Sequence, residues 1–211
     1  MSRIAIACIL CIASPALAER RMLSLDVSGG WAFDPVPASN AVAASSTFSM
    51  GPVVMLGARY GVKHYFDIAL TGFFETPVQV GHNNIVLHTE SGDFAGTLVH
   101  QSMRFGAMAG PRFVMGVVWR LSVGIDFGWA QRLSTGLKMI DDSNASAPID
   151  YGLTLADTSR ANFVVSPVIG VEWAGGDHWA LGLMPRVQIS IGKDGGWSIF
   201  LPLQLSWGWF I

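Results

Sequence analysis

Three residue types that together can perform acyl transfer fall close to one another in the chain: His100, Ser102 and Asp126. The His-x-Ser spacing places both side chains on one face of a strand, because side chains alternate along a β-strand. A carboxylate on a neighbouring strand would complete a nucleophile, base and orienting acid. That face, however, is predicted to point inward, away from any lipid substrate. We therefore interpret these residues as structural and predict that the protein is not an enzyme.

A second group could in principle bind a metal. His82, His88, Glu90 and Asp93 lie within residues 75–97, which we expect to form a solvated loop. The chain has two cysteines, Cys8 and Cys11, and no GxGxxG, P-loop or HExxH motif occurs. The sequence therefore predicts no metal, thiolate or cofactor site in the mature protein.

The elements that carry these residues show a period of two. In residues 119–129 every odd position is apolar, with Trp119 and Trp129 at the ends, whereas the even positions are small, polar or charged. This alternation predicts a β-strand with one apolar face. Eleven residues match the length of a tilted strand that crosses a bilayer.

Seven further segments show the same alternation, more weakly toward the N-terminus. The predicted strands are 23–33, 50–60, 65–74, 98–113, 119–129, 162–173, 179–191 and 197–211. Short links and long loops alternate between them, with long loops expected at 34–49, 75–97 and 131–161. An even number of strands with this alternation is typical of an antiparallel up-and-down barrel in an outer membrane. Pro167, Pro185 and Pro202 fit poorly, so we expect bulges or water there.

Nearly every charge within these segments lies on the polar face. We predict that these side chains form a charge network in the barrel lumen: Asp26, Arg59, Asp67, Arg104, Arg112, Arg120, Asp126, Glu172 and Arg186. Five positive and four negative groups nearly balance. Because an eight-stranded barrel has room for little beyond side chains, we expect them to pair and fill the lumen.

The first eighteen residues are typical of a cleaved secretory signal peptide. Arg3 precedes a short apolar run, and Ala16-Leu17-Ala18 supplies small residues before a cleavage point. The expected domains are thus a signal peptide at 1–18 and a barrel at 19–211. Without Arg3 the mature chain has 12 basic and 15 acidic groups, so no basic patch suggests nucleic acid.

At this point the chain resembles the small outer-membrane β-barrel proteins, a group that includes OmpX and the transmembrane domain of OmpA. In that group the last strand carries an alternating apolar signal read by the barrel-assembly machinery. Here the matching residues are Leu203, Leu205, Trp207, Trp209 and Ile211, with Ile211 in place of the usual terminal phenylalanine. The resemblance implies a monomer in contact with outer-membrane lipid and lipopolysaccharide.

Four alternatives remain at this level. A soluble lipid-binding barrel would turn its apolar face inward. A narrow porin-like pore, or a lateral route for small apolar molecules, would use the same wall. A lipid A-modifying enzyme is suggested by a His-x-Ser spacing similar to that of the deacylase PagL, although Met103 stands where that family has asparagine. The favoured reading is a non-enzymatic barrel whose surface loops serve interaction or envelope integrity.

Overall fold

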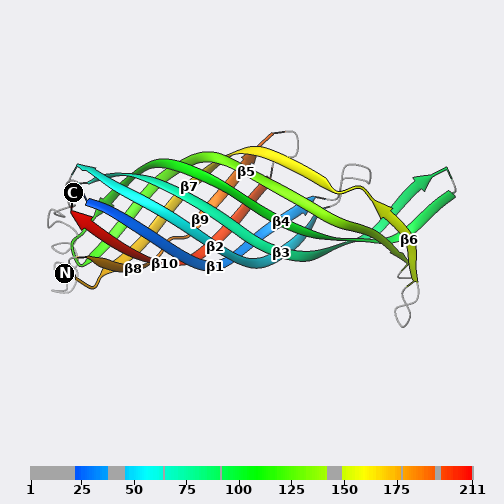
Figure 1. The fold of residues 1–211 in the computed structure, drawn as a ribbon, viewed down its shortest axis with the longest axis horizontal. Coiled ribbons are helices and arrows are strands. Elements are labelled where there is room, and N and C mark those ends of the chain that lie inside the picture. The colour runs from blue at the N-terminus through cyan, green and yellow to red at the C-terminus, as the bar shows by residue number, and fades with distance from the viewer. Residues whose placement is uncertain are drawn as a thin grey trace, which may run out of the picture.

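The structure is a computed structural model that describes residues 22–37, 46–63, 65–90, 92–141, 149–176, 178–192 and 196–210. The expected signal peptide and Ile211 lie outside these residues. The described chain is built from β-strands (Figure 1). None of the described residues forms a helix long and apolar enough to cross a membrane.

The strands form one closed antiparallel barrel. Their bounds are β1 Met22–Pro37, β2 Ser46–Lys63, β3 Phe66–Thr89, β4 Gly92–Met115, β5 Trp119–Asp141, β6 Ile149–Leu155, β7 Thr158–Ala174, β8 Trp179–Leu183, β9 Arg186–Ile191 and β10 Gly196–Phe210. Strand β1 pairs with β10, which closes the ring. Strands β8 and β9 both pair with β7 and β10, so they are two halves of one wall strand. Strand β6 pairs only with β5, and β5 pairs directly with β7 in the wall, so β6 is not part of the ring. The barrel itself therefore has eight strands, as the sequence predicts.

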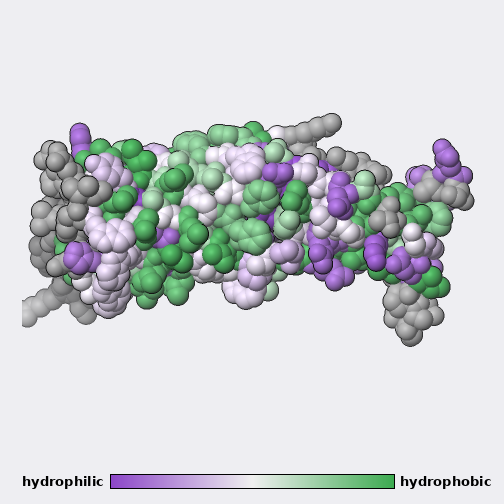
Figure 2. Space-filling model, viewed as in Figure 1, coloured by the Kyte–Doolittle hydropathy of each residue, from purple (hydrophilic) through white to green (hydrophobic). Residues whose placement is uncertain are grey.

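The two faces of the wall differ as the alternation requires. On β5 the apolar residues of the odd positions are exposed, from Trp119 at 66% to Ile125 at 38%, whereas Ser122 and Asp126 are fully buried. Figure 2 shows apolar side chains gathered over the visible face of the barrel, and exposed apolar residues on the other wall strands complete an apolar band. A soluble barrel with an apolar interior would have the opposite arrangement, so that alternative is wrong. Only closed barrels and helices satisfy all backbone groups in lipid.

The predicted long loops are largely wrong, because the strands continue through them. Strands β3 and β4 stay paired from Phe66–Phe113 out to Thr89–Gly92, and β5 runs to Asp141, where β6 pairs with it. We call residues 78–90, 92–100, 133–141 and 149–155 the extension. It projects beyond the barrel at the end away from the start of β1 and the end of β10 (Figure 1). Inward and outward side chains continue to alternate beyond the apolar band. A period of two therefore identifies a strand, but it does not by itself show where that strand leaves the membrane.

Of the three prolines, only Pro185 coincides with a break in a wall strand, and the register is the same on both sides of it. The strand breaks between β8 and β9 at Met184–Pro185, where Met184 N–H donates to Pro202 O at 3.2 Å and Ile169 N–H donates to Pro185 O at 3.3 Å. Pro167 and Pro202 remain in the ladders opposite Ile125 and Gly30. The expected bulges are thus replaced by one strand break, since proline cannot donate a ladder hydrogen bond.

Candidate functional site

The inner face of β4 shows how the lumen is organised. Inward positions at intervals of four residues are, in chain order, His100, Arg104, Met108 and Arg112, and all four are buried. Because strand side chains alternate, residues four apart share a face and lie successive steps along the barrel axis. The lumen is therefore layered, with charged and apolar cross-sections in turn.

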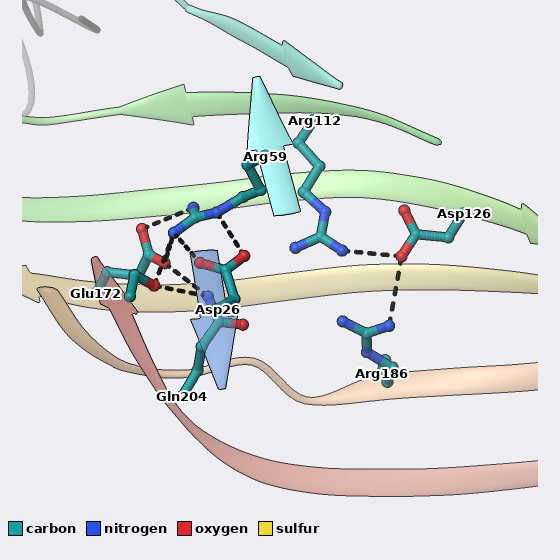
Figure 3. Close-up of polar contacts among 8 residues, drawn as sticks. Asp26, Arg59, Arg112, Asp126, Glu172, Arg186 and Gln204 are labelled. Carbon is teal, nitrogen blue, oxygen red and sulfur yellow. Dashed lines mark hydrogen bonds and ion pairs between the residues drawn. The ribbon is translucent and has the colours of Figure 1, made fainter. Parts of the chain in front are cut away.

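Arg59 on β2 is the centre of the first charge layer (Figure 3). Its guanidinium contacts Asp26 of β1 at 2.9 Å and Glu172 of β7 at 2.8 Å, and it donates to Ser206 of β10 at 2.8 Å. Gln204 donates to Glu172 at 3.1 Å. One arginine thus binds side chains from three other strands, and both of its carboxylate partners are buried.

Asp126 of β5 holds the second charge layer together (Figure 3). Its Oδ2 accepts from Arg112 of β4 at 2.9 Å and from Arg186 of β9 at 3.4 Å. All three residues are at least 97% buried. Two guanidinium groups share one carboxylate here, and Oδ1 of Asp126 has no hydrogen-bond partner among the described residues.

An apolar layer lies between these two charge layers and the end of the barrel that carries the extension. Its side chains are buried and come from every side of the barrel: Ala32, Val53, Met55, Phe73, Met108, Ala130, Val164 and Phe200. Phe73 and Phe200 meet edge to face at 5.7 Å. Phe73 points inward. This layer puts apolar atoms across the path of water.

Arg104 forms the third charge layer above the two phenylalanines. It contacts Glu75 at 2.8 Å and donates to Gln188 Oε1 at 2.9 Å and to Ser198 Oγ. Its guanidinium carbon lies 5.5 Å from the Phe73 ring centre and 5.1 Å from that of Phe200. Such cation–π contacts stabilise a desolvated arginine.

Two further members of this layer came from predicted loops. Asp34 of β1 pairs with Arg132 of β5 and accepts from Ser198 at 3.0 Å. Sequence reasoning missed Asp34, Glu75 and Arg132 because each lies past the last aromatic residue of its predicted strand. All three continue the series of inward-facing positions of their strands, and extending that alternation past the aromatic residues would have identified them.

Asp67 and Arg120 lie apart from these layers. Together with Arg59 and His178 they line a pocket, partly open to solvent, at the end of the barrel where β1 begins. Arg120 Nε donates to Val117 O at 3.3 Å. Within the described part of the chain Asp67 has no ion pair. Two of the nine predicted network residues thus belong to the mouth.

The candidate catalytic residues are separated. Ser102 and His100 share the buried face of β4, but Asp126 lies on β5 beside Phe127, whose partner on β4 is Ala109. Nine residues along β4 from His100 to Ala109 correspond to about 30 Å. Asp126 is also bound by two arginines. No acyl-transfer triad can form from this set.

The histidines and carboxylates considered as possible metal ligands are also divided. His82 is fully buried in β3, whereas His88 is exposed and pairs with Asp93 at 2.7 Å. Placing His82 in a solvated loop was wrong. Among the described residues no three His, Cys, Asp or Glu side chains lie close enough together to hold a metal ion.

The four described residues of the predicted assembly signal lie on the outer face of β10. Leu203, Leu205, Trp207 and Trp209 are each 44–53% exposed. This orientation places them where lipid or an assembly partner could contact them. Nothing in the geometry tests the signal itself.

No protein-family model and no curated protein matches the chain. Solved structures do match its fold. Neisserial surface protein A has a TM-score of 0.53 and 12% identity, with 88% of this chain and 96% of that chain covered. The outer membrane protein OprG of Pseudomonas aeruginosa has a TM-score of 0.52 and 9% identity, covering 92% and 100%.

The attachment invasion locus protein Ail of Yersinia pestis, solved with the heparin analogue sucrose octasulfate, has a TM-score of 0.50 and 13% identity, covering 89% and 99%. At these identities the likeness establishes the fold. The chain therefore has the fold of the small eight-stranded outer-membrane barrels, which is the fold that the sequence predicts.

Proposed function

We propose that this chain, folded as a small outer-membrane barrel, is a non-enzymatic integral protein of a bacterial outer membrane. In this proposal the wall is surrounded by lipid and lipopolysaccharide, and the barrel-assembly machinery inserts it as a monomer. The closed barrel then holds the extension outside the membrane as an interaction surface. The fold, the exposed apolar band and the separation of His100 and Ser102 from Asp126 support this reading.

The observation that carries the proposal is the filled lumen. Arg59, Asp126 and Arg104 each bind side chains from several strands, and the apolar layer lies across the barrel. Water in a continuous channel would have to displace buried ion pairs and hydrate apolar side chains. Such a barrel fits a membrane scaffold better than a polar pore.

Conductance in planar bilayers tests this closure. The wild-type protein is expected to give no steady single-channel current. Replacing Phe73 and Phe200 together by alanine removes the largest side chains of the apolar layer and should produce leak events. Leu201→Ala is the matched control, because Leu201 neighbours Phe200 but faces outward at 47% exposure. A steady current through the wild-type protein would contradict the proposal.

A role for the extension is tested separately. Its apolar centre is formed by Ile85, Leu87, Leu98, Leu137 and Met139. Among the described residues, exposed polar pairs around it are His88–Asp93 and Lys138–Asp150. Reversing the charges of Asp93, Lys138 and Asp150 should change adhesion or envelope phenotypes without changing the heat-modifiable gel migration of the barrel. Unchanged phenotypes in all charge-reversed variants would contradict an interaction surface.

A lateral route for small apolar molecules is a second candidate, favoured by the strand break at Met184–Pro185. Pro202 on β10 lies beside this break, so the wall has fewer donors there. Met184 fills the inner side and is fully buried. Uptake of an apolar dye into vesicles tests the route. Rates equal to those of protein-free vesicles would exclude it.

A further inference from the structure

Two buried histidines face each other where the barrel meets the extension. Nε2 of His82 on β3 and Nε2 of His100 on β4 are 3.2 Å apart. The ring planes differ by 5° and the ring centres are 5.3 Å apart, so the rings meet nitrogen to nitrogen and not face to face. Both residues are at least 99% buried. The geometry is that of an in-plane N–H···N hydrogen bond.

Such a bond requires one protonated and one bare Nε2. Thr47 of β2 donates its hydroxyl proton to Gly81 O at 3.0 Å, and its oxygen lies 3.3 Å from Nδ1 of His82. The hydroxyl oxygen can therefore accept from Nδ1–H of His82. This leaves Nε2 of His82 bare, with His100 as the donor to it. The network assigns one proton to each ring, so both rings are neutral.

The charged groups around the pair do not compensate a positive ring. Arg132 of β5 faces it, and Arg160 of β7 is the register partner of Arg132. The carboxylates of the third charge layer have arginine partners of their own: Asp34 of β1 binds Arg132, and Glu75 of β3 binds Arg104 of β4. A bound cation would meet the same positive surroundings, which argues against a metal between the rings.

In the proposed placement the membrane-spanning segments end at the register partners Phe74 and Phe105, so both histidines lie outside them. Their surroundings determine the direction of the titration. Burial, with a smaller contribution from His100, lowers the pKa of His82 to about 4. Burial, followed by Arg132, lowers the pKa of His100. Both rings thus stay neutral at pH 7, where the hydrogen bond between them is intact.

We propose that the His82–His100 pair is an acid-sensitive latch between β3 and β4 at the base of the extension. When both rings carry a second proton, two N–H groups face each other and the bond between the strands is lost. The charged pair then requires water, which enters only if β3 and β4 open at this point. The inference rests on the proposed position of the extension outside the membrane, but on no particular ligand.

The direction of the pH effect on closure follows from how many protons each state binds. The closed state holds its histidines at a pKa below the ordinary value, so the opened state binds more protons. Closure is fully favoured above about pH 6.5 and weakens as the pH falls toward 4. For His82 alone, the opening equilibrium should rise about 30-fold between pH 7.5 and pH 5.0.

Hydrogen exchange of the mature protein in lipid nanodiscs measures this opening. After correction for the intrinsic effect of pH, amides of residues 78–82 and 98–102 should exchange roughly 30-fold faster at pH 5.0 than at pH 7.5. Residues 119–129, in the membrane-spanning wall, should not change. A variant with both His82→Leu and His100→Leu should exchange equally at both pH values. His88→Ala, which alters an exposed histidine, should keep the wild-type response.

A titration of the wild-type histidine ring carbons by NMR is independent of how any variant folds. Two buried rings that titrate below pH 5.5 support the latch, and an ordinary pKa for both would overturn it. So would an unchanged acid response in the double leucine variant. Placement is read separately, by labelling Asp93→Cys on whole cells with a membrane-impermeant thiol reagent. Absence of labelling there would refute the proposed position of the extension while leaving the acid response measurable.

Discussion

Buried arginines dominate the interior at the level of single residues. Arg59, Arg104, Arg112 and Arg186 are each at least 93% buried, and each has a carboxylate partner. Desolvation of such pairs offsets much of their attraction, so a pair need not stabilise more than apolar side chains would. Removing one partner is a different case, because it leaves the other charge buried alone. Loss of one of these arginines is therefore expected to destabilise the fold chiefly because it leaves a buried carboxylate without its cation.

Arg104→Ala should lower the free energy of unfolding by about 3–5 kcal/mol, because Glu75 is left without its cation in a buried site. Urea unfolding in detergent, followed by heat-modifiable gel migration, measures the change. Combining Arg104→Met with Glu75→Gln should recover part of it, since neither charge then remains.

Lys138→Ala is the matched control for this experiment. Lys138 pairs with Asp150 at 3.8 Å, but both side chains are at least half exposed. Exposed pairs contribute little because water screens them. A loss at Lys138 as large as the loss at Arg104 would contradict the distinction between buried and exposed pairs.

At the level of the element, each wall strand combines a lipid face and a lumen face. Strand β5 shows this most clearly, with its apolar face exposed between Trp119 and Trp129 and its polar face buried. At the turn before it, Gly116 has a φ of +109°, and a Cβ there would collide with the carbonyl oxygen of Trp119. Glycine is therefore required where β4 turns into β5.

Val123→Arg should destabilise the folded barrel by about 2–4 kcal/mol, because Val123 lies near the middle of the lipid face of β5. The same substitution at Val117, an exposed residue of the turn, should cost at most about 1 kcal/mol near the interface. Unfolding in lipid vesicles compares the two. Equal losses at both positions would mean that the outer face does not contact hydrocarbon.

Because the strands continue into the extension, the segments predicted to be loops cannot be deleted without losing contacts inside the barrel. Deleting residues 75–97 and 131–160 as loops would take away Glu75, Arg132 and most of the outer apolar centre. The interior and the extension therefore depend on the same strands. Shorter changes at the tip of the β3–β4 hairpin leave those contacts in place.

At the level of the whole molecule, the exposed apolar band requires a surrounding of lipid or detergent. Large apolar side chains from all parts of the wall are exposed, from Leu25 on β1 to Trp209 on β10. Contiguous apolar surface of this extent is rare on soluble monomers. The barrel is closed, so the band cannot be covered by rearranging a sheet edge.

The mature protein should fold and stay monomeric in detergent and aggregate when detergent is removed. Its folded form should migrate faster on unheated gels than the heated chain. Size-exclusion chromatography with and without detergent measures the difference. A folded monomer in plain buffer would show that the wall does not face lipid.

The sequence alone determined the barrel, its strand number and the inward position of its charges, because a closed sheet in lipid imposes a strict period of two on every strand. Tertiary structure alone decided the partners. Asp126 meets both Arg112 and Arg186, and Arg59 reaches Glu172, because strand tilt and register bring together residues far apart in the chain.

The extension shows the same division. Its residues alternate as strands do, but they lack the apolar outer face by which the membrane-spanning strands are recognised. Only pairing with neighbours showed that residues 75–89 and 92–97 are strand and that His82 is buried against His100. A contact between strands depends on register, and register is a property of the folded sheet that neither strand encodes by itself.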